Sequence, residues 1–289
     1  NNVDYVKKED MKRTIRDLEE QVAFLTARLG EKEAVGSSSV SIGSQFTSVA
    51  KGSVIRELQD KLTREISTNL PAERIDDVAI AAASQTGDQG MNIGRSASLL
   101  AGLPNTVPGY SIDRWCAGAM TAVTTLSSAI MAGAYDLALA GGVEHMTHHP
   151  MGEGMDPNPR YLSEKIVDPE AMAMGMTAEN LHDRFPHLTK ERADAFALGS
   201  QEKTAKAYAN GLIQPDLVPV AARSAELGSV LVSVDEAPRP GTTLEGLASL
   251  KTPFRPHGRV SAGNASGLSD GATAALLANE GVADQLGLT

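Results

Sequence analysis

The sequence predicts an α/β fold in which helices cover a mostly parallel sheet. Strands are expected at Asp77–Ala83, at Tyr110–Arg114 and within Ala134–Met146. Helical patterns lie between them, at Asn92–Ala101 and from Cys116 to Gly133. Strands that alternate with helices along a chain are typical of a sheet whose strands run in parallel.

Each of these elements has its own local signal. After its first residue, Asp77–Ala83 is an apolar run that indicates a buried strand. The helix that starts at Asn92 is expected to end at Gly102 and Pro104, because glycine and proline stop helices. The segment Ala134–Met146 contains a short polar turn, a buried strand and a Gly-Gly break.

Cys116 lies where the strand before it meets the helix after it, so this helix would connect two strands as a βαβ unit. The partial positive charge at a helix N-terminus favours a thiolate over a thiol, which makes Cys116 a candidate nucleophile. The alternative is a buried structural cysteine, because free cysteine is among the most buried residue types.

Residues 147–255 have a different character, with Met- and Pro-rich loops, little strand pattern and polar helices such as Lys190–Asn210. The glycine-rich segment Ser261–Ala272 follows, and we expect it to lead into a second helix of small residues.

The first segment of the chain predicts an amphipathic helix from about Lys8 to Arg28, followed by a Ser/Gly-rich linker over 35–52 and a second amphipathic helix over 53–66. Apolar residues of the first helix recur at alternating spacings of four and three. They are Met11, Ile15, Leu18, Val22, Leu25 and Leu29. Packing on its own domain and association with another helix both remain open.

Composition excludes several classes of protein. The chain has 289 residues, 42% hydrophobic and 21% charged, as in globular proteins. Its net charge of −10 argues against a general nucleic-acid or anionic-membrane binder. One cysteine leaves no internal disulfide, and neither a membrane span nor a signal-peptide core is present. We expect a soluble, cytoplasmic protein.

No metal or nucleotide cofactor is expected. His145, His148 and His149 lack an Asp, Glu or Cys spacing that completes a metal site. Glu144 is interpreted as a hydrogen-bonded structural carboxylate. The glycines from Gly87 to Gly94 lack the full dinucleotide fingerprint.

Several motifs together resemble the N-terminal half of the thiolase family over roughly residues 70 to 285, in both order and spacing. The motifs are Ile75-Asp-Asp-Val78, Gln85-x-Gly87, Leu100-Ala-Gly-Leu-Pro104, Cys116 with its helix, Met174–Asn180 and Ser261–Ala272. Two further motifs, Gly142-Val-Glu-His-Met146 and Pro150-Met-Gly152, look most like the degradative 3-ketoacyl-CoA thiolases of fatty-acid β-oxidation.

The resemblance implies thiolytic cleavage of a 3-ketoacyl-CoA to acyl-CoA and acetyl-CoA, with Cys116 forming an acyl-enzyme that coenzyme A resolves. Coenzyme A is then a substrate and no cofactor is needed. In the family, an activating histidine, a water-positioning asparagine and a second cysteine come from the C-terminal half, so we expect an incomplete active site in this chain. The family's first strand and Arg-Thr-Pro loop are not recognisable.

The resemblance also assigns substrate contacts. Arg239 corresponds to an arginine near the coenzyme A nucleotide, where a guanidinium suits phosphate or adenine contact. Phe254 and Ala262 match cleft-lining positions, and Ser266 matches a serine that contacts the pantetheine arm. Met174 would border the acyl pocket.

From these observations we expect a heptad helix over 1–34, a linker over 35–52 and a loop domain over 147–255 that shapes the acyl tunnel. The N-terminal thiolase domain would comprise 53–146 and 256–280, and residues 281–289 would begin a linker to a C-terminal domain. A homodimer or a dimer of dimers is implied by the resemblance. Two alternatives remain: biosynthetic condensation of two acetyl-CoA molecules, and a non-catalytic module for acyl-CoA binding or assembly.

Overall fold

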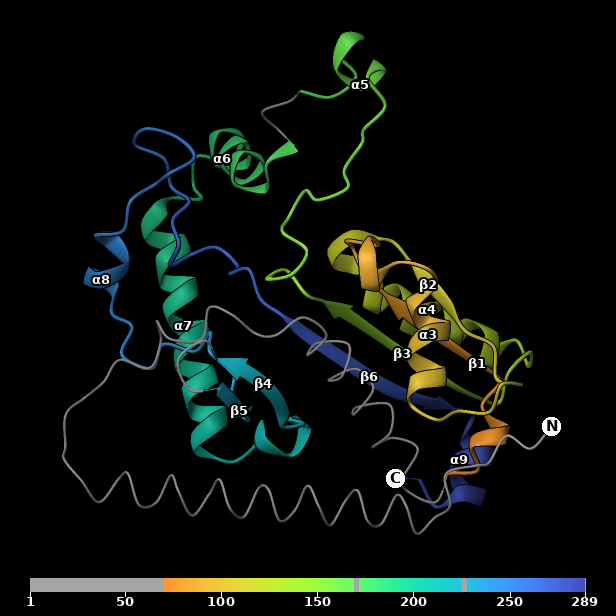
Figure 1. Cartoon of the computed structure of the whole chain (residues 1–289). Helices are drawn as coiled ribbons and strands as arrows, with labels where there is room; N and C mark the ends of the chain where they lie inside the picture. The colour runs from red at the N-terminus through yellow and green to blue at the C-terminus, as the bar shows by residue number, and fades with distance from the viewer. Residues whose placement is uncertain (1–69, 169–171, 225–227, 289) are drawn as a thin grey trace.

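A four-stranded sheet with helices on both faces forms one part of the fold, on the right in Figure 1. The computed structural model describes residues 70–168, 172–224 and 228–288. The strands are β1 (Asp77–Ala81), β2 (Tyr110–Ile112), β3 (Leu137–Glu144) and β6 (Gly271–Ala278). Their order in the sheet is β2-β1-β3-β6.

The sheet is mostly parallel, as predicted. β1 pairs in parallel with β2 on one side and with β3 on the other, so that Ala79 lies opposite both Tyr110 and Ala140. β6 alone runs antiparallel, along the outer side of β3. Every residue of β1 is buried, which explains why this segment is nearly all apolar.

Alternate residues of the strands face two separate cores. On one face, Val78 and Ile80 pack with Ile93 of α3 (Ile93–Leu100) and Val282 of α9 (Glu280–Leu286). On the other face, Ala79 packs with Ala122 and Leu126 of α4 (Gly118–Met131), together with Ala138 and Ala140 of β3. Helices therefore cover both faces of the sheet.

A second group of elements stands beside the sheet in Figure 1. Its helices are α5 (Arg160–Ser163), α6 (Met174–Arg184), α7 (Lys190–Ala209) and α8 (Leu244–Ala248). A hairpin of β4 (Val220–Ser224) and β5 (Gly228–Val232) completes it. Single 3₁₀ turns are η2 (Ala72–Arg74), η3 (Gly87–Gln89), η4 (Trp115–Ala117) and η6 (Gln214–Asp216).

One predicted element is wrong, and one was not anticipated. The glycine-rich segment Ser261–Ala272 leads into strand β6 and not into a helix. The run of small apolar residues forms a strand because it pairs over its whole length with β3. The β4–β5 hairpin lies in a region where little strand was expected. The heptad helix, the linker and the helix over 53–66 lie outside the described residues.

Two of the predicted helices hold to within a few residues. The helix expected at Asn92–Ala101 is α3, with Asn92 as its N-cap. The helix expected at Lys190–Asn210 is α7, with Thr189 as its N-cap. Among the described residues, no helix has the length and apolar character needed to cross a membrane.

Candidate active site

Cys116 lies in the 3₁₀ turn η4, between the end of β2 and the start of α4. Its side chain is exposed, which argues against the buried structural alternative. Trp115 just before it has a φ of 50°, in the left-handed region that large side chains rarely adopt. The turn thus holds the thiol at the surface through a strained backbone.

Two glycines allow the first turn of α4 to pack in direct contact with the sheet. A Cβ atom added to Gly118 would lie 2.7 Å from the Cβ of Ala81, at the end of β1. A Cβ added to Gly142 in β3 would lie 2.8 Å from the Cβ of Ala119. Because both distances are shorter than packed carbon atoms allow, only glycine permits this approach. Cys116 is therefore placed at the carboxyl ends of two parallel strands.

An apolar hollow of about 330 Å³ borders the same turn. Trp115 contributes one wall, and its side chain is 65% exposed. The other lining residues come from the chain after β3 and from α5. They are Met155, Asp156, Pro157, Tyr161, Val167 and Met172. The residue beside the candidate nucleophile thus faces a space that suits an apolar group.

Glu144, at the end of β3, holds the loop that follows β1. Its carboxylate accepts hydrogen bonds from the backbone N–H groups of Ala83 (2.8 Å) and Ser84 (3.3 Å) and from the side chain of Gln89 (2.9 Å). Gln89 is fully buried, and its Oε1 accepts from the N–H of His145 at 2.6 Å. These contacts agree with the interpretation of Glu144 as a structural carboxylate.

Three histidines follow Glu144, and the loop after β1 brings an aspartate to them. Asp88 Oδ1 lies 2.5 Å from Nε2 of His149 and 3.9 Å from Nε2 of His148. Nδ1 of His149 lies 2.7 Å from Glu153. Asp88, His148 and His149 form a group with metal-ligand spacing. Spacing along the chain does not reveal this group, because Asp88 lies 61 residues before His149.

The charges in this group favour ion pairing. Burial acts to lower the pKa of His149, but its hydrogen bonds to Asp88 and Glu153 outweigh burial, and the pKa is raised. Burial likewise acts to raise the pKa of Asp88, but the hydrogen bond to His149 outweighs it, and that pKa is lowered. For His145, which is fully buried, burial lowers the pKa.

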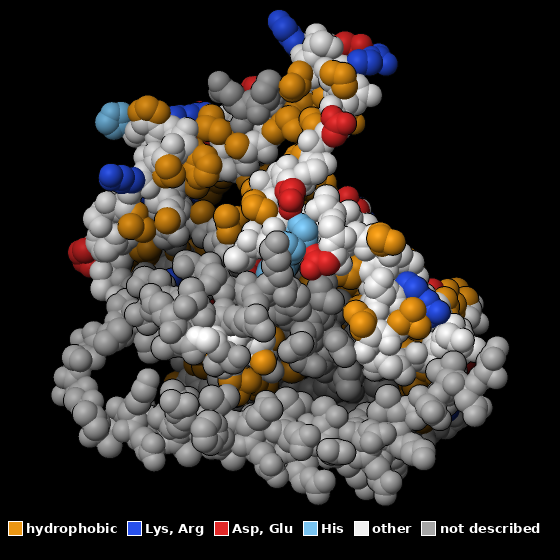
Figure 2. Space-filling view, viewed as in Figure 1, with side chains coloured by type: hydrophobic (Ala, Val, Ile, Leu, Met, Phe, Trp, Pro, Cys, Tyr) orange, Lys and Arg blue, Asp and Glu red, His pale blue; other side chains and the backbone are white. Residues whose placement is uncertain are grey.

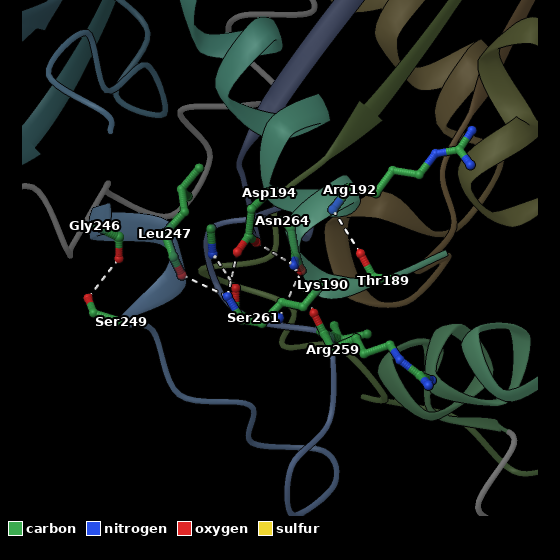
Figure 3. Close-up of polar contacts among 12 residues, drawn as sticks. Thr189, Lys190, Arg192, Asp194, Gly246, Leu247, Ser249, Arg259, Ser261 and Asn264 are labelled. Carbon is green, nitrogen blue, oxygen red and sulfur yellow. Dashed lines mark hydrogen bonds and ion pairs between the residues drawn. The ribbon is translucent and has the colours of Figure 1, made fainter. Parts of the chain in front are cut away.

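The glycine-rich segment that precedes β6 is held by a buried polar network (Figure 3). Asp194 of α7 accepts from the ammonium group of Lys190 at 2.6 Å and from the side-chain amide of Asn264 at 2.9 Å. Asn264 in turn accepts from the N–H of Ser261, and Lys190 also donates to the carbonyl of Leu247 in α8. Asp194 thus joins α7 to the segment that leads to β6, and Lys190 joins α7 to α8.

A second buried carboxylate fixes the start of the same segment. Glu179 of α6 is 1% exposed and accepts from the backbone N–H groups of Arg259 (2.7 Å) and Val260 (2.8 Å). On the surface nearby, Asp183 pairs with both Arg255 and Arg259. α6 and α7 together therefore determine where the segment from Arg259 onward lies.

The predicted substrate-binding residues lie in the second group of elements and in the segment that joins it to β6. The ring of Phe254 packs on Gly175, directly after Met174, so these two predicted positions lie close together. Met174 is exposed, and Ala262 and Ser266 are exposed within the segment that Asn264 anchors.

Arg239 lies on a separate stretch. Its backbone N–H donates to Gln201 of α7, and its exposed guanidinium donates to the carbonyl groups of Glu236 and Pro238. Within the described residues, no hydrogen bond joins Arg239 to the other predicted positions or to Cys116.

Sequence reasoning missed several residues of this region. Trp115 is the only tryptophan of the chain and stands next to its only cysteine, a signal that could have been noticed. Asp88 gave no such signal, because His149 lies 61 residues further along the chain, and the contact between Asp194 and Asn264 spans 70 residues. Lys190 and Asp194 do stand four residues apart on α7, a spacing that could have suggested their ion pair.

Comparison with known proteins identifies the family. The model described as "Thiolase, N-terminal domain" matches residues 34–281. A 3-ketoacyl-CoA thiolase of Aliivibrio fischeri is 41% identical over 215 residues, which cover 74% of this chain and 55% of that protein. A 3-oxoadipyl-CoA/3-oxo-5,6-dehydrosuberyl-CoA thiolase of Escherichia coli is 39% identical over 247 residues, covering 80% of this chain and 61% of that protein.

A solved structure is also similar to this chain. The crystal structure of the Bacillus anthracis acetyl-CoA acetyltransferase superimposes with a TM-score of 0.68 at 32% identity, over 83% of this chain and 63% of that one. The chain spans between 55% and 61% of the length of the two relatives above. With most of its length matched by the family's N-terminal domain, the chain belongs to the thiolase family.

Proposed function

We propose that this chain carries the acyl-accepting cysteine of a 3-ketoacyl-CoA thiolase. The observation that supports this most is the placement of Cys116, which is exposed on a strained turn at the start of α4, beside the apolar hollow. The relative of Aliivibrio fischeri is itself named a 3-ketoacyl-CoA thiolase.

The proposed reaction has two acyl-transfer steps. The Cys116 thiolate attacks the C3 carbonyl of the 3-ketoacyl-CoA, and an S–C bond forms while the C2–C3 bond breaks. The electron pair leaves with C2, which takes a proton to give acetyl-CoA. The thiolate of a second coenzyme A then attacks the acyl-Cys116 thioester, forms acyl-CoA and releases the Cys116 thiolate.

The family resemblance assigns the proton transfers to residues of a C-terminal half, namely a histidine, an asparagine and a second cysteine. This chain contains one cysteine and spans little more than half the length of the relatives compared. The contribution of the described residues is therefore to hold the nucleophile and the substrate.

Substrate binding is proposed for the group around α6 to α8. Arg239 would contact the nucleotide of coenzyme A, and Ser266 the pantetheine arm. Phe254 and Ala262 would line the cleft, and Met174 would border the acyl pocket. The packing of Phe254 on Gly175, the residue after Met174, supports a shared site for Phe254 and Met174. The apolar hollow at Trp115 would take the acyl chain, which favours acyl groups larger than acetyl.

The wider biological setting is also a proposal. The named relatives support a role in fatty-acid β-oxidation or in the degradation of related acyl-CoA compounds. A cytoplasmic location is proposed from the sequence alone. Homodimers or dimers of dimers are proposed from the family resemblance. Biosynthetic condensation of acetyl-CoA is the second candidate, and the structural likeness to an acetyl-CoA acetyltransferase favours it.

Mass spectrometry of the acylated protein tests the proposal. The chain is mixed with a medium-length 3-ketoacyl-CoA, and separately with an acyl-CoA. We expect an acyl adduct that maps to Cys116 and is missing from Cys116→Ala. A chain that binds coenzyme A in calorimetry but shows no adduct with either thioester contradicts the catalytic assignment and favours the binding module.

Chain length separates the two directions of reaction. Adduct yields are compared for acyl-CoA substrates from acetyl upward. A yield that rises with chain length supports the degradative assignment, because the hollow beside Trp115 is apolar. A yield confined to acetyl-CoA supports the biosynthetic one.

A further inference from the structure

Two segments far apart in the sequence bring metal-ligand atoms together outside the thiol site. Asp88 comes from η3, whereas His148 and His149 come from the turn after β3. One carboxylate oxygen and one nitrogen of each imidazole lie within 4.8 Å of one another. In Figure 2, histidine and acidic side chains gather near the centre of the view, at this end of the sheet.

The second nitrogen of His149 is already held in the way that metal-bound histidines usually are. Nδ1 lies 2.7 Å from the carboxylate of Glu153, one helical turn later in sequence, and the His149 side chain is only 6% exposed. Nε2 of His149 shares a proton with Asp88 Oδ1 at 2.5 Å, and a metal ion bound there would release that proton while the Nδ1–H stays donated to Glu153. A carboxylate behind the ligating imidazole is the common outer partner at zinc sites.

His145 provides an independent sign that a polar ligand belongs here. Its side chain is fully buried, and neither ring nitrogen has a hydrogen-bond partner in the part of the chain that the structure describes, although the carboxylate of Asp270 lies 3.7 Å from Nε2. Its ring centre lies 5.4 Å from that of His148. Buried polar groups without partners are rare and often mark an ion or a water.

We propose that Asp88, His148 and His149 bind a divalent transition metal ion of the zinc class, with Glu153 orienting His149 and a water completing the coordination. Two imidazoles and one carboxylate with an open position are a donor set that Zn²⁺ accepts. Ligand atoms about 2.0–2.2 Å from a tetrahedral ion lie roughly 3.3 Å apart. The observed separations from Asp88 Oδ1, 2.5 Å and 3.9 Å, bracket this value, so each needs a shift of less than about 1 Å.

The site would act on the wall of the apolar hollow and not on the thiol itself. The metal site would connect η3 to residues His148 to Glu153. Met155 and Asp156, which follow shortly after in the chain, line the hollow. Between them and Glu153, Gly154 packs closely on Thr86, in the loop that contains η3. Metal binding would therefore fix one wall of the proposed acyl site.

Metal titration of the full chain tests the proposal. After treatment with a chelator and its removal, Zn²⁺ binding is measured by calorimetry, and Co²⁺ is used as a coloured probe. We expect one site with a dissociation constant in the micromolar range or below and Co²⁺ absorption bands of a four- or five-coordinate ion. Asp88→Asn and His148→Gln should each weaken binding by more than about 100-fold, and Glu153→Gln by about 10- to 100-fold.

His187→Gln serves as the matched control, because His187 is exposed and lies outside the group. It should leave the affinity unchanged, as should Cys116→Ala. The proposal is wrong if the wild-type chain shows no stoichiometric site, or if folded Asp88→Asn protein binds as tightly as the wild type. If that variant fails to fold, X-ray absorption spectroscopy of the wild-type protein with bound Zn²⁺ tests the site instead. A coordination sphere without two imidazoles would contradict the proposal.

Discussion

At the residue scale, the exposure of Cys116 depends on its neighbour. Trp115 occupies the left-handed region with a φ of 50°, and its ring lines the hollow. One side chain thus combines two roles that a substitution can separate. The conformational role needs only a residue that tolerates positive φ, whereas the lining role needs a large apolar surface.

Comparing Trp115→Gly with Trp115→Ala separates these roles. Alanine keeps the strain and loses the ring, whereas glycine loses both, so the glycine variant should be more stable than the alanine variant by about 1 kcal/mol. Urea unfolding followed by circular dichroism measures the difference. Both variants should lose any preference for longer acyl groups in the adduct assay. Equal stability of the two variants would show that the turn is not strained.

Glu144 shows how a residue next to the site can be purely structural. It accepts three hydrogen bonds, all from the loop after β1 and its Gln89. Its partners lie 55 to 61 residues away in sequence. The sequence could suggest that this carboxylate is hydrogen-bonded, but it could not name the partners, because their proximity results from the parallel pairing of β1 with β3.

At the scale of elements, the contact between α4 and β1 places the nucleophile. The Cβ of Gly118→Ala would lie 2.7 Å from that of Ala81, so α4 would have to move away from the sheet. We expect a loss of about 1–3 kcal/mol in unfolding free energy, as for other overpacked cores, together with a lower acylation rate of Cys116.

Gly199→Ala is the matched control for this change. Gly199 lies in the interior of α7, and a Cβ added there meets nothing within 4 Å. Because alanine favours helix more than glycine does, this variant should gain about 0.5–1 kcal/mol. Urea unfolding of both variants checks the pair. If the two substitutions change stability in the same direction, close packing at Gly118 does not position α4.

The elements that sequence reasoning recovered are those with a local signal. β1 is buried on both faces and therefore reads as an apolar run, and α3 and α7 begin at the capping residues Asn92 and Thr189. β6 was predicted wrongly because a run of small apolar residues suits a helix or a strand. Its strand state depends on pairing with β3, more than a hundred residues earlier.

The same distinction applies to the two candidate sites. The prediction of Cys116 rests on its immediate neighbours, and the structure places it at a junction of strand and helix. The group of Asp88 with His148 and His149 depends on the sheet, because the loop after β1 and the turn after β3 meet only when those strands pair. The spacing of these residues along the chain does not indicate that they lie close together in space.

At the scale of the whole molecule, the segment from Ser261 to β6 connects the two groups of elements. Its beginning is hydrogen-bonded to α7 through Asp194 and Asn264, and its end pairs with β3 in the sheet. The predicted coenzyme A contacts Ala262 and Ser266 lie on this segment. Their position relative to Cys116 therefore depends on a network that touches neither the nucleophile nor the substrate.

Asp194→Asn tests that dependence. The variant keeps the size of the side chain, but Lys190, whose side chain is 16% exposed, loses its charged partner, and an amide donor can face its ammonium group. Breaking a buried ion pair on one side leaves an uncompensated charge, so we expect a loss of about 2–4 kcal/mol in unfolding free energy. Coenzyme A binding should weaken as well, because the segment that carries Ser266 loses its anchor.

Urea unfolding and calorimetric titration with coenzyme A measure the two effects, with Glu202→Gln as the control. Glu202 is an exposed residue on the same helix, and its substitution should change neither quantity. Because Lys190 also donates to Leu247 of α8, the double variant Asp194→Asn, Lys190→Met should lose less stability than the sum of the single changes. If the losses are additive, the two side chains act independently. In that case the ion pair of Lys190 and Asp194 does not link α8 to the segment before β6.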